Sequence, residues 1–479
     1  MVDVHRRGAT ATWSFAVRCG SMTRRRASSL ARAAAVAAGA AIGVAAPAGA
    51  APPAAAAPAS FTAPVELASA QYGLGAAVAT DAAGATTAVV TGSGAPKLLQ
   101  RAAGAPLPGP ARLPGDPRGV KGPVVAAAGQ GALGIAWRVD TPRRYGGIQA
   151  EVRDPGGALS TPIVVAADDS GGVRHPALAV DPAGDALLAY NTDTRRSHLS
   201  MRGAIAVAYR PAHGSFAAPV MVDSEQSLPP AVALAPDGTG IVAWSRHSRV
   251  YAVSIAQGEL GKVKSVAASN GIGSLVVAAG PGGEATLAWS GSSDSHRRYE
   301  VRVLRRFAGR SFGRVRVLRA TTGYVSEVAL AADENGRATA AWTEDQTGQP
   351  GASDGLTTFV RSATAAPGHA FGASRVVAAS GKRYRQSLSI AAVSGRVAMA
   401  WGYKLDNRHV GVQATVGPAG ALPTPQTIAS TSLVTNFYVL PPLTRITLDR
   451  SGAATALAAL PSEPAPRQIV SRLVAMDGR

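Results

Sequence analysis

A glycine followed six residues later by an aromatic residue recurs along the chain and constrains its fold more than any other feature. The complete pairs are Gly131/Trp137, Gly184/Tyr190, Gly238/Trp244, Gly283/Trp289, Gly336/Trp342 and Gly395/Trp401. Two weaker copies keep the spacing with other residues, at Gly84/Val90 and Gly452/Ala458. Successive glycines stand 45 to 59 residues apart, which is the length of one propeller blade. This period predicts a ring of repeats in place of separate domains.

Each repeat predicts four short strands. An apolar first strand, such as 176–181, leads through an Asp-Pro-Ala-Gly turn into a second strand that ends at the aromatic residue. Neither strand alternates in polarity, so we expect both faces to be buried, with the aromatic residue in the core. A Phe/Leu-x-x-Pro signature marks the fourth strand, at Phe61/Pro64, Leu107/Pro110, Leu159/Pro162, Phe216/Pro219 and Leu422/Pro425. Because proline cannot donate to a ladder, we expect this strand at the edge of its sheet.

The order of these strands predicts how the ring closes. A fourth strand at 60–70 precedes the first repeat, and the chain ends after a third strand at 468–475, so the N-terminal strand should complete the last blade. We predict an all-β β-propeller of eight four-stranded blades, with seven as the alternative if a terminal repeat is irregular. The predicted propeller spans 60–479, with blades at about 72–121, 122–174, 175–227, 228–271, 272–324, 325–384, 385–442, and 443–479 together with 60–71.

The N-terminal region predicts export. Residues 1–50 form an extension and a signal peptide, in which Arg24 to Arg26 precede the apolar run 33–46 and a small-residue cleavage site at 48–50. A Pro/Ala-rich spacer follows at 51–59. We expect a secreted or cell-surface protein with no transmembrane segment after signal removal. The single cysteine, Cys19, precedes the apolar run, so the mature chain lacks disulfides and thiol chemistry.

The net charge of +19 has two interpretations. It could attract polyanions such as cell-wall polymers or acidic glycans. It could also reflect a GC-rich genome, because the chain has 42 Arg against 6 Lys. No dense basic run interleaved with aromatic residues occurs, which argues against nucleic acid as a partner.

The repeat style resembles known propellers. The segment 177–185, Ala-Leu-Ala-Val-Asp-Pro-Ala-Gly-Asp, loosely resembles an NHL-type repeat, and the chain as a whole resembles exported β-propeller repeat proteins of actinobacteria. The sialidase Asp box, Ser-x-Asp-x-Gly-x-Thr-Trp, is not met, because the glycine and the tryptophan stand six residues apart here and three there. The resemblance implies a fold and no particular function.

The connections between second and third strands are rich in Asp, Arg and His, and we expect them on one face around the channel mouth. The candidate ligand-binding residues are Asp140, Arg143, Asp193, Arg195, His198, Arg246, His247, Asp294, His296, Asp345, Asp406 and His409. Arginine forks suit carboxylate, sulfate or phosphate groups, and Asp and His suit sugar hydroxyls. The alternative is that these residues are only the polar surface of solvated loops.

These observations favour a monomeric, non-enzymatic binding or interaction module. Its partner would be a glycan, a cell-wall polymer or another protein. The alternative is a polysaccharide-active hydrolase or lyase on the same face, because acidic loops could supply two carboxylates about 5–9.5 Å apart. The sequence identifies no catalytic residue. We expect no cofactor and no metal, since the loop histidines belong to different repeats without a His-x-x-x-His spacing.

Overall fold

A computed structural model describes residues 60–478, apart from internal segments at 71–74, 82, 92–95, 106–108, 110, 114–119, 142–143, 168–172, 193–202, 293–297, 346–356, 381–383, 406–407, 433–442 and 466–467. The predicted signal peptide and spacer therefore lie outside the described residues. Within the described part of the chain, no helix is long and apolar enough to cross a membrane.

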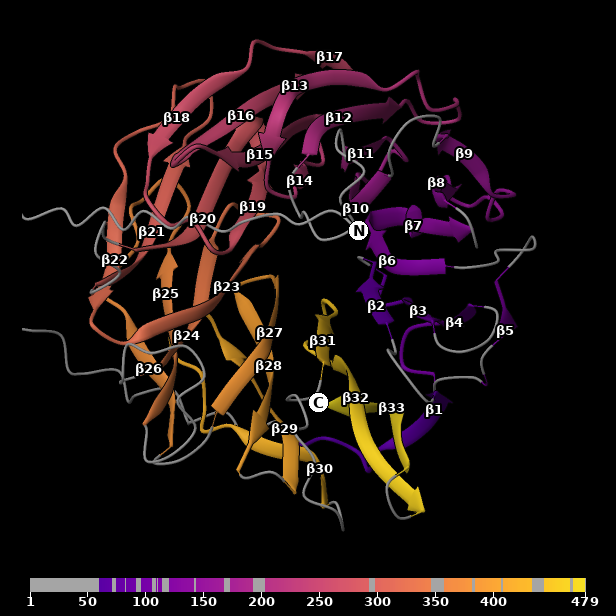
Figure 1. Cartoon of the computed structure of the whole chain (residues 1–479), viewed down its shortest axis with the longest axis vertical. Helices are drawn as coiled ribbons and strands as arrows, with labels where there is room; N and C mark the ends of the chain where they lie inside the picture. The colour runs from indigo at the N-terminus through magenta and orange to yellow at the C-terminus, as the bar shows by residue number, and fades with distance from the viewer. Residues whose placement is uncertain are drawn as a thin grey trace, which may run out of the picture. The chain divides into compact units, whose positions relative to one another are not determined.

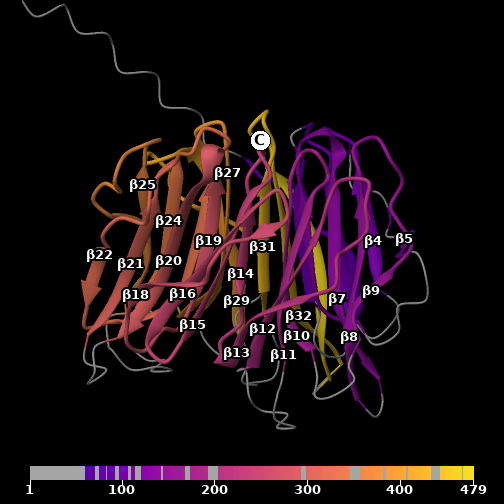
Figure 2. The ribbon, with the colours of Figure 1, turned by 90° about the horizontal axis from the view of Figure 1, so that it is seen from above.

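Eight antiparallel sheets follow one another around a ring, which confirms the predicted eight-bladed β-propeller (Figure 1). In each blade the strands A, B, C and D are hydrogen-bonded in that order, with strand A nearest the centre of the ring (Figure 1). Figure 2 shows the same strands from the side, running between the two faces of the ring.

The first four blades follow the chain order. Blade one contains β2 (Gly75–Thr80), β3 (Thr86–Thr91), β4 (Lys97–Arg101) and β5 (Ala111–Arg112). Blade two contains β6 (Val120–Ala127), the short 3-10 turn η1 (Gly129–Gly131), β7 (Leu133–Thr141), β8 (Arg144–Arg153) and β9 (Ile163–Ala166). Blade three contains β10 (Val173–Val180), β11 (Ala186–Thr192), β12 (Gly203–Arg210) and β13 (Val220–Ser227). Blade four contains β14 (Ala231–Leu234), β15 (Thr239–Arg246), β16 (Arg249–Ala256), and an outer strand divided into β17 (Glu259–Leu260) and β18 (Lys264–Ala268).

The last four blades repeat the same order. Blade five contains β19 (Leu275–Gly280), the 3-10 turn η2 (Pro281–Gly283), β20 (Glu284–Ser292), β21 (Tyr299–Arg306) and β22 (Arg316–Thr321). Blade six contains β23 (Tyr324–Ala332), β24 (Ala338–Asp345), β25 (Thr358–Ala365) and β26 (Arg375–Ser380). Blade seven contains β27 (Tyr384–Val393), β28 (Arg396–Lys404), β29 (His409–Pro418) and β30 (Gln426–Ser432). Blade eight contains β31 (Leu443–Leu448), β32 (Ala454–Ala465), β33 (Gln468–Gly478) and β1 (Val65–Ala70).

The N-terminal strand completes the last blade, as predicted. Strand β1 pairs antiparallel with β33, with Val65 opposite Ala475. The Thr62 N–H donates to the Asp477 carbonyl at 2.7 Å, and Phe61 packs against the core of blade eight. The ring is thus closed by main-chain pairing between the two ends of the propeller, which covers an otherwise open sheet edge.

The repeated glycine has a conformational reason. All eight turn glycines take a left-handed φ, from 74° at Gly238 and Gly283 to 100° at Gly184. Side chains other than glycine rarely adopt this region. At Gly184 an added Cβ would also lie 2.6 Å from Asp154 Oδ1 of the preceding blade. The turn glycine therefore serves both the turn and the close approach of neighbouring blades.

The repeated aromatic residue is in the core, as predicted. All five tryptophans at this position have fully buried side chains, and so do the alanines that precede them. Their indole rings fill the space between blades. For example, the Trp244 Nε1–H donates to Asp223 Oδ2 at 2.6 Å, and the Trp289 Nε1–H donates to Ser269 Oγ at 2.9 Å. Both acceptors belong to the preceding blade, so each indole also links two sheets.

The proline signature differs in position from the prediction. Pro64, Pro162, Pro219 and Pro425 each stand immediately before the outer strand and not within it. A proline there gives up no ladder hydrogen bond, because pairing begins one residue later. The Phe or Leu of the signature packs into the interblade core, as Phe216 and Leu422 do. The Leu107/Pro110 copy lies outside the described residues.

Candidate functional site

The two faces of the ring carry different connections. Because the strands alternate in direction, all A–B and C–D turns lie on one face, here called the turn face, and all B–C and D–A connections lie on the other, here called the B–C face. The structure describes four predicted site residues on the B–C face in full, namely Arg246, His247, Asp345 and His409, and places Asp140 in β7. The other seven lie outside the described residues: Arg143, Asp193, Arg195, His198, Asp294, His296 and Asp406.

Arg246 and His247 lie together, and both contact carboxylates that the sequence analysis did not select. The Arg246 Nη1 is 2.7 Å from Asp223 Oδ1 and 3.1 Å from Glu225 Oε1. Its guanidinium carbon lies 4.4 Å from the centre of the Tyr251 ring, and the His247 Nδ1 is 3.3 Å from Glu225 Oε2. Burial opposes the charge of Arg246, but hydrogen bonding to Tyr251 and the charge of Asp223 hold its pKa above the ordinary value.

A second charged cluster surrounds the buried carboxylate of Glu344 in β24. Two nitrogens of Arg319 donate to it at 2.7 and 2.9 Å, the Arg361 Nε lies 2.8 Å away, and the Thr321 hydroxyl donates at 2.9 Å. Burial alone would raise the pKa of Glu344, but the hydrogen bonds from Arg319 and Thr321 and the charge of Arg361 hold it below the ordinary value. Glu344 is therefore held in its ionised form, and its ion pair with Arg319 joins blades five and six.

The two clusters occupy equivalent positions with opposite charges. Arg246 and Glu344 each stand two residues after the buried tryptophan of their blade. Their partners Asp223 and Arg319 each lie on the D strand of the preceding blade, in the same register. In most other blades this D-strand position holds alanine: Ala166, Ala267, Ala378 and Ala429. In blade four the arginine is on strand B and the carboxylate on the preceding strand D, and in blade six the two have changed places, so the residues still attract each other. We call each of these pairs, Arg246 with Asp223 and Glu344 with Arg319, an interblade lock.

Asp345 and His409 lie apart from this cluster of Arg246 and His247. Asp345 is the last residue of β24, and its side chain is buried. His409 begins β29 in the next blade and is exposed. Among the described residues, the predicted site therefore contains one close pair, with single members on other blades.

The innermost strands of the ring have a feature that the sequence analysis missed. Strands β6, β10, β23 and β27 each contain an irregularity near the B–C face. Within these, His175 and Ser387 have positive φ values of 49° and 60°. His175 thus lies inside β10. All four bulges lie near the B–C face, and a bulge changes the direction in which a side chain points. Side chains of these A strands therefore point toward the next blade.

Side chains at these bulges bind the main chain of the following A strand. Glu327 Oε2 accepts the Leu388 N–H at 2.5 Å, and Ser387 Oγ accepts the Thr444 N–H at 2.8 Å. The carboxylate of Glu327 also faces Arg445, whose pKa burial lowers. These contacts join the innermost strands of blades six, seven and eight near the B–C face.

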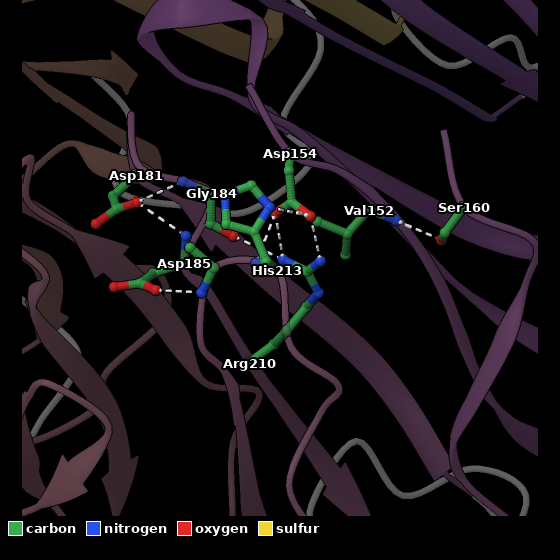
Figure 3. A network of polar contacts seen from close by, with 9 residues as sticks. Val152, Asp154, Ser160, Asp181, Gly184, Asp185, Arg210 and His213 are labelled. Atoms are coloured by element: carbon green, nitrogen blue, oxygen red, sulfur yellow. Dashed lines mark hydrogen bonds and ion pairs between the residues drawn. The ribbon is translucent and has the colours of Figure 1, made fainter. Parts of the chain in front are cut away.

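The turn face is closed by its own carboxylates. Asp181 Oδ1 accepts the N–H groups of Gly184 and Asp185 at 3.0 and 2.9 Å (Figure 3). It also accepts the Ala183 N–H at 2.9 Å. Asp333 and Asp449 accept the equivalent N–H four residues later in their own turns. Neighbouring turns are also joined, since Asp333 Oδ2 accepts the Gly395 N–H at 2.9 Å. Such turns present few unsatisfied main-chain groups to a ligand.

An arginine recurs at the end of strand C on this face. Arg101, Arg153, Arg210 and Arg306 all pair with the second residue after the turn glycine of their blade. Arg153, Arg210 and Arg306 donate to the carbonyl of that glycine, at 2.9, 2.9 and 3.0 Å. The sequence hides this repeat, because the B–C connections differ in length and the arginine stands 17 to 26 residues after the glycine.

Figure 3 shows how one of these arginines is neutralised. Asp154, in the C–D turn of blade two, receives hydrogen bonds at 2.9 Å from both terminal nitrogens of Arg210 in blade three (Figure 3). The His213 N–H adds a third at 3.2 Å. The bond from Arg210 holds the pKa of Asp154 below its ordinary value, against the effect of burial. The result is a bidentate ion pair across the junction.

The described residues supply little catalytic chemistry. Within them, no group of three or more His, Cys, Asp or Glu side chains could hold a metal ion. Burial raises the pKa of Glu151 to about 7, a value that would suit a general acid. Its side chain is nevertheless fully buried in β8, where a substrate could not contact it.

No family model and no curated protein matches the chain. Solved propeller structures do resemble it. The BP39L lectin from Burkholderia pseudomallei is 11% identical with a TM-score of 0.49, covering 74% of this chain and 98% of the lectin. A polysaccharide lyase described as an ulvan lyase is 10% identical with a TM-score of 0.45, covering 71% of this chain and 89% of the lyase. A prolyl endopeptidase is 12% identical with a TM-score of 0.46, covering 84% of this chain but 54% of the endopeptidase.

Proposed function

We propose that the protein is an exported binding module that holds a glycan or another anionic polymer on its B–C face. The difference between the two faces carries this proposal. On the turn face the A–B turns are short, and those of blades one, three, six and eight are closed by their own aspartates. On the B–C face, in contrast, β11 ends at Thr192 and β12 begins only at Gly203, and β24 and β25 are separated in the same way. Long connections on a rigid scaffold are where binding residues are usually found.

The chemistry of these connections supports a polymer of sugars or acids. The connection that follows β11 carries Asp193, Arg195 and His198. Arginine binds planar oxyanions through two parallel hydrogen bonds, and Asp and His bind hydroxyl groups. Residues 1–50 account for +6 of the net charge of +19, and the +13 that remains after their removal would draw a polyanion toward the ring before these contacts form.

A glycan and cell-wall polymer array at two salt concentrations tests this proposal. We expect the triple variant Asp193→Ala, Arg195→Ala and His198→Ala to lose about tenfold or more in affinity for the polymer that the wild type prefers. The matched control removes one acid, one arginine and one histidine from the turn face, by Glu259→Ala, Arg450→Ala and His369→Ala. Equal losses in the two triple variants, or no loss in either, would contradict a site on the B–C face.

Two further measurements test the rest of the proposal. Export predicts that the protein recovered outside the cytoplasm begins shortly after Ala50, which N-terminal sequencing of fractionated cells can check. A binding module predicts that the bound polymer keeps its chain length during prolonged incubation. Shortening of the polymer would contradict a purely binding role and would indicate a hydrolase or lyase.

A further inference from the structure

A groove on the outer rim of the turn face lies between blades four and five. Its volume is about 400 Å³. It lies beside the break between β17 and β18, where the outer strand of blade four is interrupted. The lining residues are Ala252, Ser254, Gly261, Lys262, Lys264, Ser265 and Val266 of blade four and Arg306, Arg310, Ser311 and Phe312 of blade five.

The charge of this groove is entirely positive. Lys262, Lys264, Arg306 and Arg310 line it, and no carboxylate does. Arg210 and Arg246, in contrast, have acidic partners. Within the described part of the chain, none of the four cations of the groove forms an ion pair. Four cations in a concave surface repel one another, so a bound anion would be stabilised.

Arg306 is the oriented member of this group. Its Nε donates to the Gly283 carbonyl at 3.0 Å, Nη1 donates to the Ser254 hydroxyl, and the guanidinium carbon lies 5.4 Å from the centre of the Phe312 ring. A guanidinium has five N–H donors, so these two bonds fix its plane and leave donors for a ligand. Burial lowers the pKa of Arg306, which indicates that the desolvation of its charge is not offset by a neighbouring carboxylate.

Blade three shows what Arg306 lacks. Arg210 occupies the equivalent register and binds both oxygens of Asp154 from the preceding blade (Figure 3). Asp154 directly follows Arg153, the strand-C residue that pairs with Leu133, two residues after the turn glycine of blade two. Blade four precedes the blade that contains Arg306, and its residue at the position of Asp154 is Ala256. Blade five therefore has an arginine in the same register but without the carboxylate that pairs with it in blade three. Arg306 contacts its glycine carbonyl through Nε, whereas Arg210 does so through Nη1.

We propose that this groove binds the sulfate or carboxylate groups of an acidic polysaccharide, with one oxyanion taking on Arg306 the place that Asp154 takes on Arg210. Lys262, Lys264 and Arg310 would hold the neighbouring anionic groups of the polymer. The hydroxyls of Ser254, Ser265 and Ser311 suit sugar hydroxyls, and the partly buried Phe312 lies beside the Arg306 guanidinium. This site lies on the opposite face from the B–C connections and goes beyond the proposed function.

The addition of an internal carboxylate tests the proposal directly. Ala256→Asp should place an oxyanion on Arg306 and weaken binding of dextran sulfate, polygalacturonate or both by about tenfold. Comparison of the two polymers separates sulfate from carboxylate recognition, and neutral dextran should not bind. The matched control is Ala102→Asp, which adds the same charge at the equivalent position of blade one and should change affinity by less than about twofold.

A second variant tests the rest of the groove. Lys262→Ala, Lys264→Ala and Arg310→Ala together should lower affinity and reduce its salt dependence, because three screened attractions are lost. The control Lys97→Ala, Arg298→Ala and Arg375→Ala removes equal charge from positions outside the groove and should have little effect. Equal weakening by each variant and its control, or equal affinity for single-stranded DNA, would overturn the proposal. The same measurements repeated in the background of the B–C face variant Asp193→Ala, Arg195→Ala and His198→Ala should show the same losses, because that background removes the other proposed site, so the two sites can fail separately.

Discussion

At the residue scale, Glu151 is the side chain least suited to its surroundings. It lies in β8 opposite Ile135, with no exposed surface, and neither carboxylate oxygen has a hydrogen-bond partner among the described residues. Burial without a partner disfavours the charged form, and it raises the pKa of Glu151 from 4.5 to about 7. Between about pH 4.5 and 7, Glu151 is therefore protonated in the folded protein and ionised in the unfolded chain.

We expect Glu151→Gln to stabilise the protein at neutral pH. Because the folded pKa is raised, the free energy of unfolding is highest below about pH 4.5 and falls as the pH rises toward 7. The shift from 4.5 to about 7 corresponds to at most about 3 kcal/mol. Urea unfolding of the wild type and the variant from pH 4 to 8 measures the difference. A difference between them that does not change with pH would contradict this origin.

At the scale of elements, the junctions between blades are held by two different devices. One is the lock of Arg246 with Asp223 and of Glu344 with Arg319, in which a D strand binds the next B strand. The other is the turn glycine, which lets the A–B turn approach the preceding C–D turn, as Gly184 approaches Asp154. Each device joins residues of different blades, so its loss should weaken a junction and not a strand.

We expect Glu344→Gln to destabilise the protein by about 3–5 kcal/mol, because it leaves Arg319 and Arg361 facing each other without a counter-charge. The matched control is Glu300→Gln. Glu300 also lies within 4 Å of two arginines, but its pairs with Arg298 and Arg302 are more exposed. That control should cost less than about 1 kcal/mol. Equal costs measured by chemical denaturation would show that burial of the pair is unimportant.

The turn glycines allow a similar comparison. Gly184→Ala forces a left-handed residue and places a Cβ 2.6 Å from Asp154 Oδ1 and 3.1 Å from Pro155 Cδ. Gly156→Ala forces the same kind of φ, at 69°, but meets nothing within 4 Å. We expect Gly184→Ala to cost about 1–3 kcal/mol more than Gly156→Ala, which is the effect of overpacking the junction. Equal thermal midpoints for the two variants would show that the destabilisation comes from the left-handed φ alone and not from the contact with Asp154.

At the scale of the whole molecule, closure of the ring depends on a short N-terminal strand. Strand β1 supplies the outer strand of blade eight, and Phe61 contributes to the same core. Without it, β33 would present an unpaired edge of 11 residues. The ends of the propeller thus act as one element, although they are some 400 residues apart in the sequence.

Removal of this strand should open the ring. We expect a chain that begins at residue 71 to aggregate and to melt at a lower temperature than a control chain that begins at Ser60. A synthetic peptide of residues 60–71 should restore part of the lost stability, because the edge of β33 remains available for pairing. Equal melting temperatures for the two chains, measured by circular dichroism and light scattering, would argue against closure by β1.

Much of the fold could be predicted because its rules are local and repeated. The glycine and the aromatic residue lie six residues apart within one hairpin, so their spacing survives wherever the hairpin does. The order of strands then determines the ring and its closure. The prediction for the proline signature was wrong by one residue, since the sequence cannot show where the first ladder bond forms.

The candidate site was predictable only as a set of connections. The residue types of the B–C connections are visible in the sequence, but Asp223 and Glu225, which bind Arg246, were not selected, because they lie on the preceding blade. The repeated arginine at the end of strand C was hidden by the differing lengths of the connections. Residues that pair across a junction between blades have no fixed separation in the sequence, and therefore no sequence pattern predicts them.

The amino-acid sequence by itself predicted the left-handed turns and the buried tryptophans, because each follows from residues within one repeat. The count and order of the repeats predicted the offset of the two ends and eight blades, with seven as the alternative. Only the tertiary structure decided which charges are paired and which are free. Arg210 and Arg306 have the same place in their repeats, yet Asp154 neutralises one, and Ala256 leaves the other open to a ligand. That difference arises from the neighbouring blade, since the free energy of a charge depends on what packs against it in space.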